Sequence, residues 1–177
     1  FSLCTVEPRK NLICSVKSFL QFLRQEEITD LYYVIGGGKW QDFYDQMIKE
    51  MGQDDLFEQY VKMIGYVDDE DLPYLYSQAI CFVFTSQYEG FGLPVLEAMS
   101  CGCPVITSNS SSLPEVIGNA GLMIAWNSTQ EHIDAYRRIY TDKDLRYELH
   151  ENGLDRAKLF SWEKCAGIML SEIQNKG

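Results

Sequence analysis

The sequence predicts an α/β fold in which a parallel β-sheet carries helices on both faces. Strand-like and helix-like segments alternate along the chain, which is typical of parallel strands joined by crossover helices. The length of 177 residues and the hydrophobic content of 46% suit a single domain with a substantial core. Ligands of such sheets bind beyond the carboxyl ends of the strands, so the loops at those ends are the candidate site segments.

The first part of the chain is expected to form three strands, each followed by helical structure. Short apolar runs predict strands, whereas apolar residues at helical spacing predict helices. Glycines 36–38 end the second strand, and the acidic run 68–71 suits the start of the helix that follows the third. In order, the expected segments are a strand at 2–6, a turn at 7–11, a helix at 12–24, a strand at 31–35, a helix to about 51, a short helix at 56–60, a strand from 63 to about 67, and a helix carrying Leu72, Leu75 and Tyr76.

The second part contains the most informative segment, Glu89–Glu97. The apolar, aromatic-rich run 80–85 before it predicts a buried strand. Pro94 suits the first position of a helix, because its missing N–H would be unpaired there anyway. The unit is therefore a strand, a glycine-rich loop and a helix. After it we expect a strand at 105–107, a polar loop at 108–112, a short turn at 114–117, a strand at 122–124 and three final helices.

A glycine-rich loop that opens a helix is suited to bind a phosphate. The backbone N–H groups of Phe91, Gly92 and Leu93 are expected to stay unpaired at the positive end of the helix dipole. Glu97, about one turn into the helix, leans back toward the same mouth, where it could accept hydrogen bonds from the two hydroxyls of a ribose. Glu89 on the far side could accept them from a second polyol. The arrangement describes a nucleotide-sugar site.

A simpler explanation is that the two glutamates only flank a helix N-terminus, where the dipole favours carboxylates. The surrounding sequence argues against it. Glu89–Glu97 resembles the E-x7-E motif of the retaining GT-B glycosyltransferases, which include sucrose synthase-like enzymes and bacterial polysaccharide mannosyl- and glucosyltransferases. Further segments resemble the donor-binding half of that family, in the family's order and over essentially the whole chain: Gly65-Tyr66-Val67, Leu72-Pro73-x-Leu75-Tyr76, Glu97-Ala98-Met99, Gly102-x-Pro104-Val105-Ile106, Leu113-Pro114-Glu115-Val116 and Phe160-Ser161-Trp162.

The resemblance implies a Rossmann-like sheet that forms one half of a GT-B fold. Residues 1–177 would be a single donor-binding domain, and the N-terminal acceptor domain would be absent from this chain. The expected activity of the whole enzyme is transfer of a hexose from a nucleoside-diphosphate sugar to an acceptor hydroxyl, with retained configuration and no metal or other cofactor. GDP-mannose and UDP-hexoses are the favoured donors, and bacterial polysaccharide or glycolipid synthesis the favoured setting. This half alone is expected to be inactive.

The resemblance also implies roles for individual residues. The family places a Gly-Arg pair and then a lysine in the first turn; Lys10 matches the lysine, but Cys4-Thr5 stand in place of Gly-Arg. Arg9 either replaces the missing arginine or points to solvent. Together with Glu89, Lys10 and Arg9 form the expected catalytic group. The expected donor-binding residues are Glu97, Phe91, Gly92, Leu93 and Gly90, with Gly37 lining the cleft and Val67 and Leu72 beside the base, although the last two would serve equally well in the core.

Composition excludes several other functions. With 26 acidic and 15 basic residues the net charge is −11, which opposes binding to nucleic acid or to an anionic membrane. The six cysteines form no Cys-x-x-Cys pair and the two histidines, His132 and His150, lie in helical patterns and are expected on helix surfaces, so no metal site is expected. No apolar run approaches the roughly 20 residues of a membrane span. A cytoplasmic location follows, with any membrane association made through the missing domain.

The sequence leaves alternative functions open. The chain could be a non-catalytic donor-binding or regulatory module of a two-chain glycosyltransferase. It could also be half of a nucleotide-sugar epimerase, although that family departs from the Glu-Gly-Phe-Gly-Leu-Pro spacing, or of a phosphorylase, although no pyridoxal-binding lysine is evident. A dinucleotide-binding dehydrogenase is disfavoured, because glycines 36–38 are not followed by its fingerprint.

Overall fold

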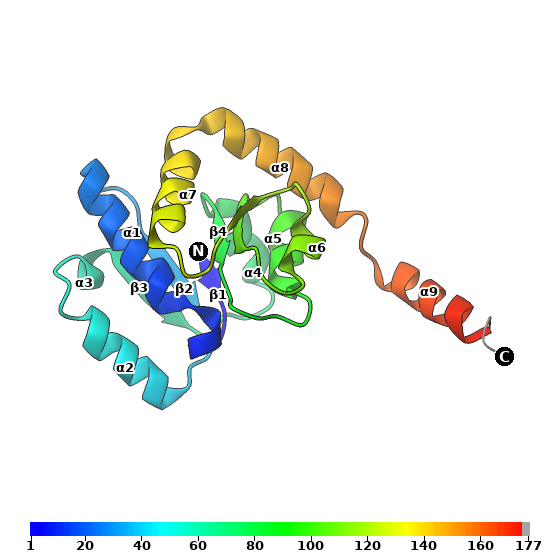
Figure 1. Cartoon of the computed structure of the whole chain (residues 1–177), viewed down its shortest axis with the longest axis horizontal. Coiled ribbons are helices and arrows are strands. Elements are labelled where there is room, and N and C mark those ends of the chain that lie inside the picture. Colours follow the sequence, from blue (N-terminus) through cyan, green and yellow to red (C-terminus); the bar gives the residue numbers. More distant parts are fainter. Residues whose placement is uncertain (175–177) are drawn as a thin grey trace.

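The computed structural model describes residues 1–174, whose strands all run parallel within two three-stranded sheets (Figure 1). The first sheet has the order β1-β2-β3 and the second β4-β5-β6. Phe1 joins them: its nitrogen donates to the Cys81 carbonyl at 2.9 Å, and its carbonyl accepts from the Val83 N–H at 2.8 Å. This is the pattern of a parallel ladder, so the strands follow the doubly wound order β3-β2-β1-β4-β5-β6. Their bounds are β1 Ser2–Leu3, β2 Tyr33–Gly36, β3 Val61–Gly65, β4 Phe82–Phe84, β5 Val105–Ser108 and β6 Leu122–Ile124.

Helices cover both faces of the strands (Figure 1). One apolar core packs α1, α2 and α7 together, and the other packs α4, α5 and α6; α8 lies against α5. The sequence prediction of a parallel sheet between two helical layers is confirmed. The helical segments are the 3₁₀ helix η1 Pro8–Lys10, α1 Leu12–Glu26, α2 Gln41–Met51, α3 Phe57–Tyr60, α4 Leu72–Gln78, α5 Leu93–Ser100, α6 Leu113–Ile117, α7 Thr129–Thr141, α8 Lys143–Ala157 and α9 Trp162–Gln174.

The side chains of β4 alternate between the two cores, which explains why helices cover both faces of the strands. Phe82 and Phe84 contribute to the α4–α5–α6 core, while Val83, between them, contributes to the α1–α2–α7 core. In β5, Val105 and Ile106 are divided between the two cores in the same way. Since successive strand residues point to opposite faces, an apolar run of this kind is stable only with a helical layer on each side.

The structure corrects several details of the expected elements. The first strand ends at Leu3 rather than residue 6, and Val6 forms only an isolated parallel bridge with Lys39. The turn expected at 7–11 is the 3₁₀ helix η1, which ends at left-handed Asn11 (φ 59°). The third strand lies two residues earlier than expected, and the turn at 114–117 is part of α6. His132 is fully buried on α7 instead of lying on a helix surface, because its ring packs beside Tyr136.

The last helix projects away from the two cores (Figure 1). None of its described residues is buried, and four apolar side chains near its end, Ile168, Met169, Leu170 and Ile173, are exposed. α9 therefore presents unpartnered apolar surface. Within the part of the chain that the structure describes, no helix has both the length and the apolar character needed to cross a membrane.

Gly37 makes possible the close approach of the two loops that follow β1 and β2. Its φ is +117°, and a Cβ there would lie 2.3 Å from the Cys4 carbonyl oxygen. We predict that Gly37→Ala lowers the free energy of unfolding by about 1–3 kcal/mol, from backbone strain alone. Urea unfolding measures the change. Gly38→Ala is the matched control, since its Cβ would meet nothing within 4 Å; an equal loss in both variants would contradict the explanation.

Candidate functional site

The candidate site lies where the loops after β1, β4 and β5 meet at the carboxyl edge of the strands. The Gln87 N–H donates to the Arg9 carbonyl at 2.9 Å, which joins η1 to the loop after β4. Ser111, in the loop after β5, exchanges two hydrogen bonds with the backbone of Glu89: it accepts from the N–H at 2.9 Å and donates to the carbonyl at 2.5 Å. The Ser112 hydroxyl lies 3.0 Å from the same carbonyl. The glycine-rich loop is thus held from both sides.

A compact ion cluster forms the centre of the site. Lys10 Nζ lies 2.7 Å from Glu89 Oε1, and Arg9 Nη1 lies 2.9 Å from Glu89 Oε2. The Lys10 and Glu89 side chains are only 12% and 11% exposed, and the Lys10 ammonium also lies over the Phe84 ring. The structure therefore brings together the three residues expected as the catalytic group. Arg9 points into the cluster and not to solvent, although its side chain is 42% exposed.

The charges of this cluster set the protonation of Glu89. Partial burial by itself raises the pKa of the Glu89 carboxyl, but the hydrogen bond and charge of Lys10, with a further hydrogen bond from Arg9, outweigh burial, so the pKa lies below its ordinary value of 4.5. Glu89 is therefore ionised at neutral pH. Cys4, which replaces the family's glycine beside this cluster, carries no charge there, because burial raises the pKa of its thiol to about 12.

The α5 helix supplies a second kind of anion-binding group. It begins at Leu93, so Pro94 is its second residue and not its first. Gly92 is the N-cap with a φ of +101°, and a Cβ there would lie 2.6 Å from Leu113 Cδ2. Within residues 1–174, the N–H groups of Phe91, Gly92 and Leu93 donate to no protein atom. These three donors remain available at the positive end of the helix.

Glu97 lies apart from the ion cluster and has its own partner. The Tyr76 hydroxyl, on α4, donates to Glu97 Oε2 at 3.2 Å. Burial, with a further contribution from the Glu97 charge, raises the pKa of Tyr76, so this hydroxyl stays protonated and can donate. Glu97 itself is exposed. One carboxylate oxygen is held by Tyr76, and the side chain is open to a ligand hydroxyl.

The remaining expected site residues have mixed surroundings. Gly90 is exposed, and a Cβ there would meet nothing within 4 Å. Gly37 contacts the backbone of Cys4, so its role in the structure is to let the two loops meet. Val67 lies over Gly36 and borders a surface hollow that also includes Tyr66 and Asp68. Leu72 packs against the α4–α5–α6 core, which is the structural role that the sequence left open for it.

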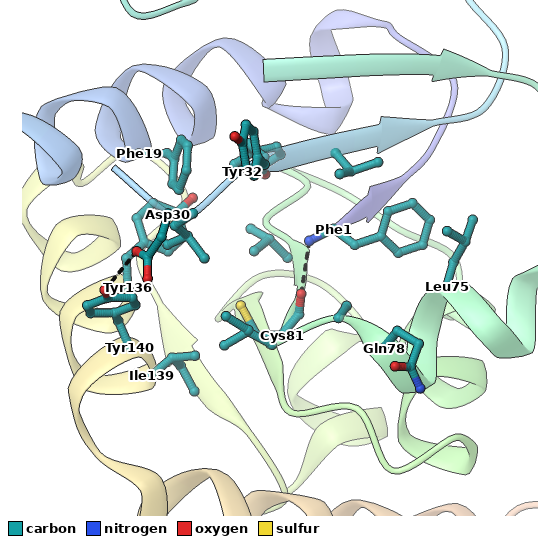
Figure 2. Close-up of a pocket in the computed structure, with 16 residues that line it drawn as sticks. Phe1, Phe19, Asp30, Tyr32, Leu75, Gln78, Cys81, Tyr136, Ile139 and Tyr140 are labelled. Carbon is teal, nitrogen blue, oxygen red and sulfur yellow. Dashed lines mark hydrogen bonds between the residues drawn. The ribbon is translucent and has the colours of Figure 1, made fainter. Parts of the chain in front are cut away.

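A separate cavity of about 340 Å³ lies at the opposite, amino edge of the strands. Figure 2 shows the side chains that line it. It is lined mainly by apolar and aromatic side chains such as Phe1, Phe19 and Tyr136. Among its described lining residues there is no lysine or arginine. This cavity therefore lacks the side-chain cations that a diphosphate requires.

Sequence reasoning missed four residues that shape the site: Glu7, Tyr76, Ser111 and Ser112. The position of the serines after a strand was a usable signal, because strand ends of a parallel sheet meet at one edge. The described residues contain no group of three His, Cys, Asp or Glu side chains placed to hold a metal ion.

Comparison with known proteins then identifies the family. Residues 1–156 match the family described as glycosyl transferases group 1. The chain belongs to this family. It is 42% identical over 161 residues to O-antigen chain mannosyltransferase B of Escherichia coli, an alignment that covers 91% of the chain and 42% of that protein. It is also 28% identical over an alignment of 189 positions to spinach sucrose-phosphate synthase, which covers 97% of the chain and 18% of that enzyme.

Solved structures agree on the fold of this glycosyltransferase chain. Anabaena HepE, in complex with UDP and glucose, superposes with a TM-score of 0.81 at 19% identity, over 99% of the chain and 47% of HepE. The C-terminal domain of the group 1 protein LpcC from Francisella tularensis superposes with a TM-score of 0.77 at 27% identity, over 89% of the chain and 83% of that domain. The chain thus has the fold of one half of a GT-B glycosyltransferase, and it spans less than half of the mannosyltransferase and of HepE.

Because the pKa of Glu89 is lowered, its contribution to the stability of the fold depends on pH. A carboxylate whose folded pKa is depressed stabilises the fold above its unfolded pKa and loses that contribution as pH falls through the folded pKa. We predict that Glu89→Gln lowers the free energy of unfolding by about 1–3 kcal/mol at pH 7. This difference in stability from the unmodified chain should shrink below about pH 4.5. Urea unfolding between pH 3 and 7 measures it, with exposed Glu148→Gln as the control. A difference that is independent of pH would contradict the assignment.

Proposed function

We propose that this chain is the donor-binding half of a retaining glycosyltransferase that moves a hexose from a nucleoside-diphosphate sugar to an acceptor hydroxyl. The observation that carries the proposal is the convergence of Lys10 and Arg9 on Glu89, four residues before α5 begins, where the first N–H groups donate to no atom of the described residues. A diphosphate needs cations and backbone N–H donors in one place, and both lie here at the carboxyl edge of the strands.

In the proposed reaction the diphosphate is the leaving group. Its negative charge grows as the bond to the sugar breaks, and N–H groups and cations already in place stabilise that charge without rearrangement. The N–H groups of Gly92 and Leu93 and the ammonium of Lys10 supply this stabilisation. Because the chain's own cations bind the diphosphate, the proposal requires no metal ion and no other cofactor.

The two glutamates have different proposed roles. Glu89 pairs with Lys10 and Arg9, the cations that the diphosphate would bind. Donor binding therefore frees the Glu89 carboxylate to accept hydrogen bonds from the sugar hydroxyls. Glu97 accepts from the ribose hydroxyls while Tyr76 holds one of its oxygens. The hollow beside Val67 is the proposed place of the base. Gly90 and Gly92, which have no side chains, leave the phosphates room to reach the loop.

The acceptor half is proposed to be a separate N-terminal domain of a longer protein. The chain covers only 42% of the E. coli mannosyltransferase, and the LpcC domain that it matches is described as C-terminal. The exposed apolar side chains of α9 offer a surface for that domain. Transfer by residues 1–177 alone is therefore expected to be negligible, since an acceptor would have no site.

The donor is proposed to be GDP-mannose or a UDP-hexose. Similarity to an O-antigen mannosyltransferase supports a mannose donor and a role in polysaccharide synthesis, and the likeness to HepE bound to UDP and glucose supports a UDP-hexose. Calorimetric titration of the chain with GDP, UDP and ADP, and with their sugar conjugates, distinguishes these. Binding of one nucleotide by the chain, and its loss in Glu97→Ala, is the expected result. No binding of any nucleotide would contradict the proposal.

Lys10 provides the sharpest single test of the diphosphate site. A charge-assisted hydrogen bond is worth roughly 1.5–3 kcal/mol, so Lys10→Ala should weaken nucleoside-diphosphate binding more than tenfold. The corresponding nucleoside without phosphates should bind both forms equally. Lys17→Ala is the matched control, because Lys17 is an exposed residue of α1 that pairs with Glu50 of α2. An unchanged dissociation constant in Lys10→Ala would remove Lys10 from the site.

A further inference from the structure

Glu7 is a buried carboxylate that the proposed reaction does not use. The residue is 7% exposed, and it lies in extended backbone directly before Pro8 and the helix η1. A buried carboxylate is costly unless it is paired and hydrogen-bonded. Its partner is Arg9, whose Nη2 lies 2.6 Å from Glu7 Oε1. A glutamate with almost no access to solvent thus anchors an arginine at the edge of the site.

The Arg9 guanidinium is shared between fixed and movable partners. Nη2 contacts Glu7, while Nη1 contacts Glu89 Oε2 at 2.9 Å and donates to the Tyr88 carbonyl at 2.7 Å. A guanidinium has five N–H donors, so donors remain for a phosphate oxygen. Glu89 is the partner that leaves when it turns to the sugar, whereas Glu7 has no other proposed task.

Arg9 needs such an anchor because of its place in the chain. Successive side chains of a 3₁₀ helix point about 120° apart, yet Arg9 and Lys10 are adjacent in η1 and reach the same carboxylate. Arg9 is also far more exposed than Lys10, at 42% against 12%, so it has more rotamers to lose on binding. The fixed carboxylate of Glu7 reduces the conformational entropy that Arg9 loses on binding.

We propose that Glu7 is a positioning residue, which keeps the Arg9 guanidinium facing the diphosphate when Glu89 moves to the sugar. The inference rests on the proposed function and extends it to a residue that does not touch the donor. Arg9 thereby takes the place of the arginine that is missing at Cys4-Thr5. It can do so because Glu7 holds its guanidinium in position.

Charge and positioning predict opposite effects for removal of the Glu7 carboxylate. The four groups Glu7, Arg9, Lys10 and Glu89 carry two negative and two positive charges. Glu7→Gln removes one negative charge, and by Coulomb attraction alone it would tighten the binding of an anion. If Glu7 acts by holding Arg9, the same change weakens binding.

The test is calorimetric titration of the 177-residue chain and its Glu7→Gln variant with GDP and with UDP. We expect about tenfold weaker binding of whichever nucleotide the chain binds, from loss of one charge-assisted contact. Glu7→Asp keeps the charge but retracts it by one methylene, and it should weaken binding similarly. Glu26→Gln is the matched control, because the partner of Glu26 is Arg137, at 2.7 Å, and neither residue belongs to the site. This variant should bind the nucleotide as the unmodified chain does.

A double-mutant cycle separates positioning from a general structural role. In an Arg9→Gln background, Glu7→Gln should have no further effect on the dissociation constant. An equal further loss there, or unchanged or tighter binding in the single variants, would overturn the inference while leaving the donor site intact. If the unmodified chain binds neither nucleotide, the proposed function is contradicted, and so is the inference, which depends on it. Glu7→Asp supplies the measurement if Glu7→Gln does not fold.

Discussion

The ion cluster of Glu89 with Lys10 and Arg9 is the interaction on which the rest of the site depends. It joins the loop after β1 to the loop after β4, about 80 residues further along the chain. These are the two strands between which the strand order reverses, where loops diverge and open sheets leave a crevice for ligands. Opposite charges are paired at this edge of the sheet. Under the proposed function a diphosphate would replace Glu89 as the partner of Lys10 and Arg9, so neither cation would be left without an anion.

Backbone geometry places these charges. Lys10 is the last residue of η1, and left-handed Asn11 both ends η1 and forms the N-cap of α1. On the facing side, Gly92 turns the chain into α5 against Leu113, and Ser111 fixes the backbone of Glu89. The Gly92 and Ser111 contacts join the loops after β4 and β5, and the Lys10 and Arg9 ion pairs join the loop after β1 to them, so the site requires all three loops to pack together.

Much of this architecture could be predicted from the sequence, because it depends on local patterns. Apolar runs predicted the strands, and the Glu89–Glu97 segment predicted the loop and helix at the centre of the site. The errors arise where tertiary contacts decide. The first strand ends early because the chain must turn into η1, and His132 is buried because α7 packs against α1. Whether Arg9 faced solvent or the site could not be predicted, since it depends on Glu7 and on Glu89, which lies 80 positions away.

Binding of a nucleoside diphosphate at this edge of the sheet is tested most directly by a crystal structure of the chain with bound GDP or UDP. We predict phosphate oxygens within hydrogen-bond distance of the Gly92 and Leu93 N–H groups and of Lys10 Nζ, the ribose at Glu97, and Glu89 released from Arg9 and Lys10. A nucleotide bound elsewhere, for example in the apolar cavity at the opposite edge, or phosphates that leave the ion cluster unchanged, would contradict the account.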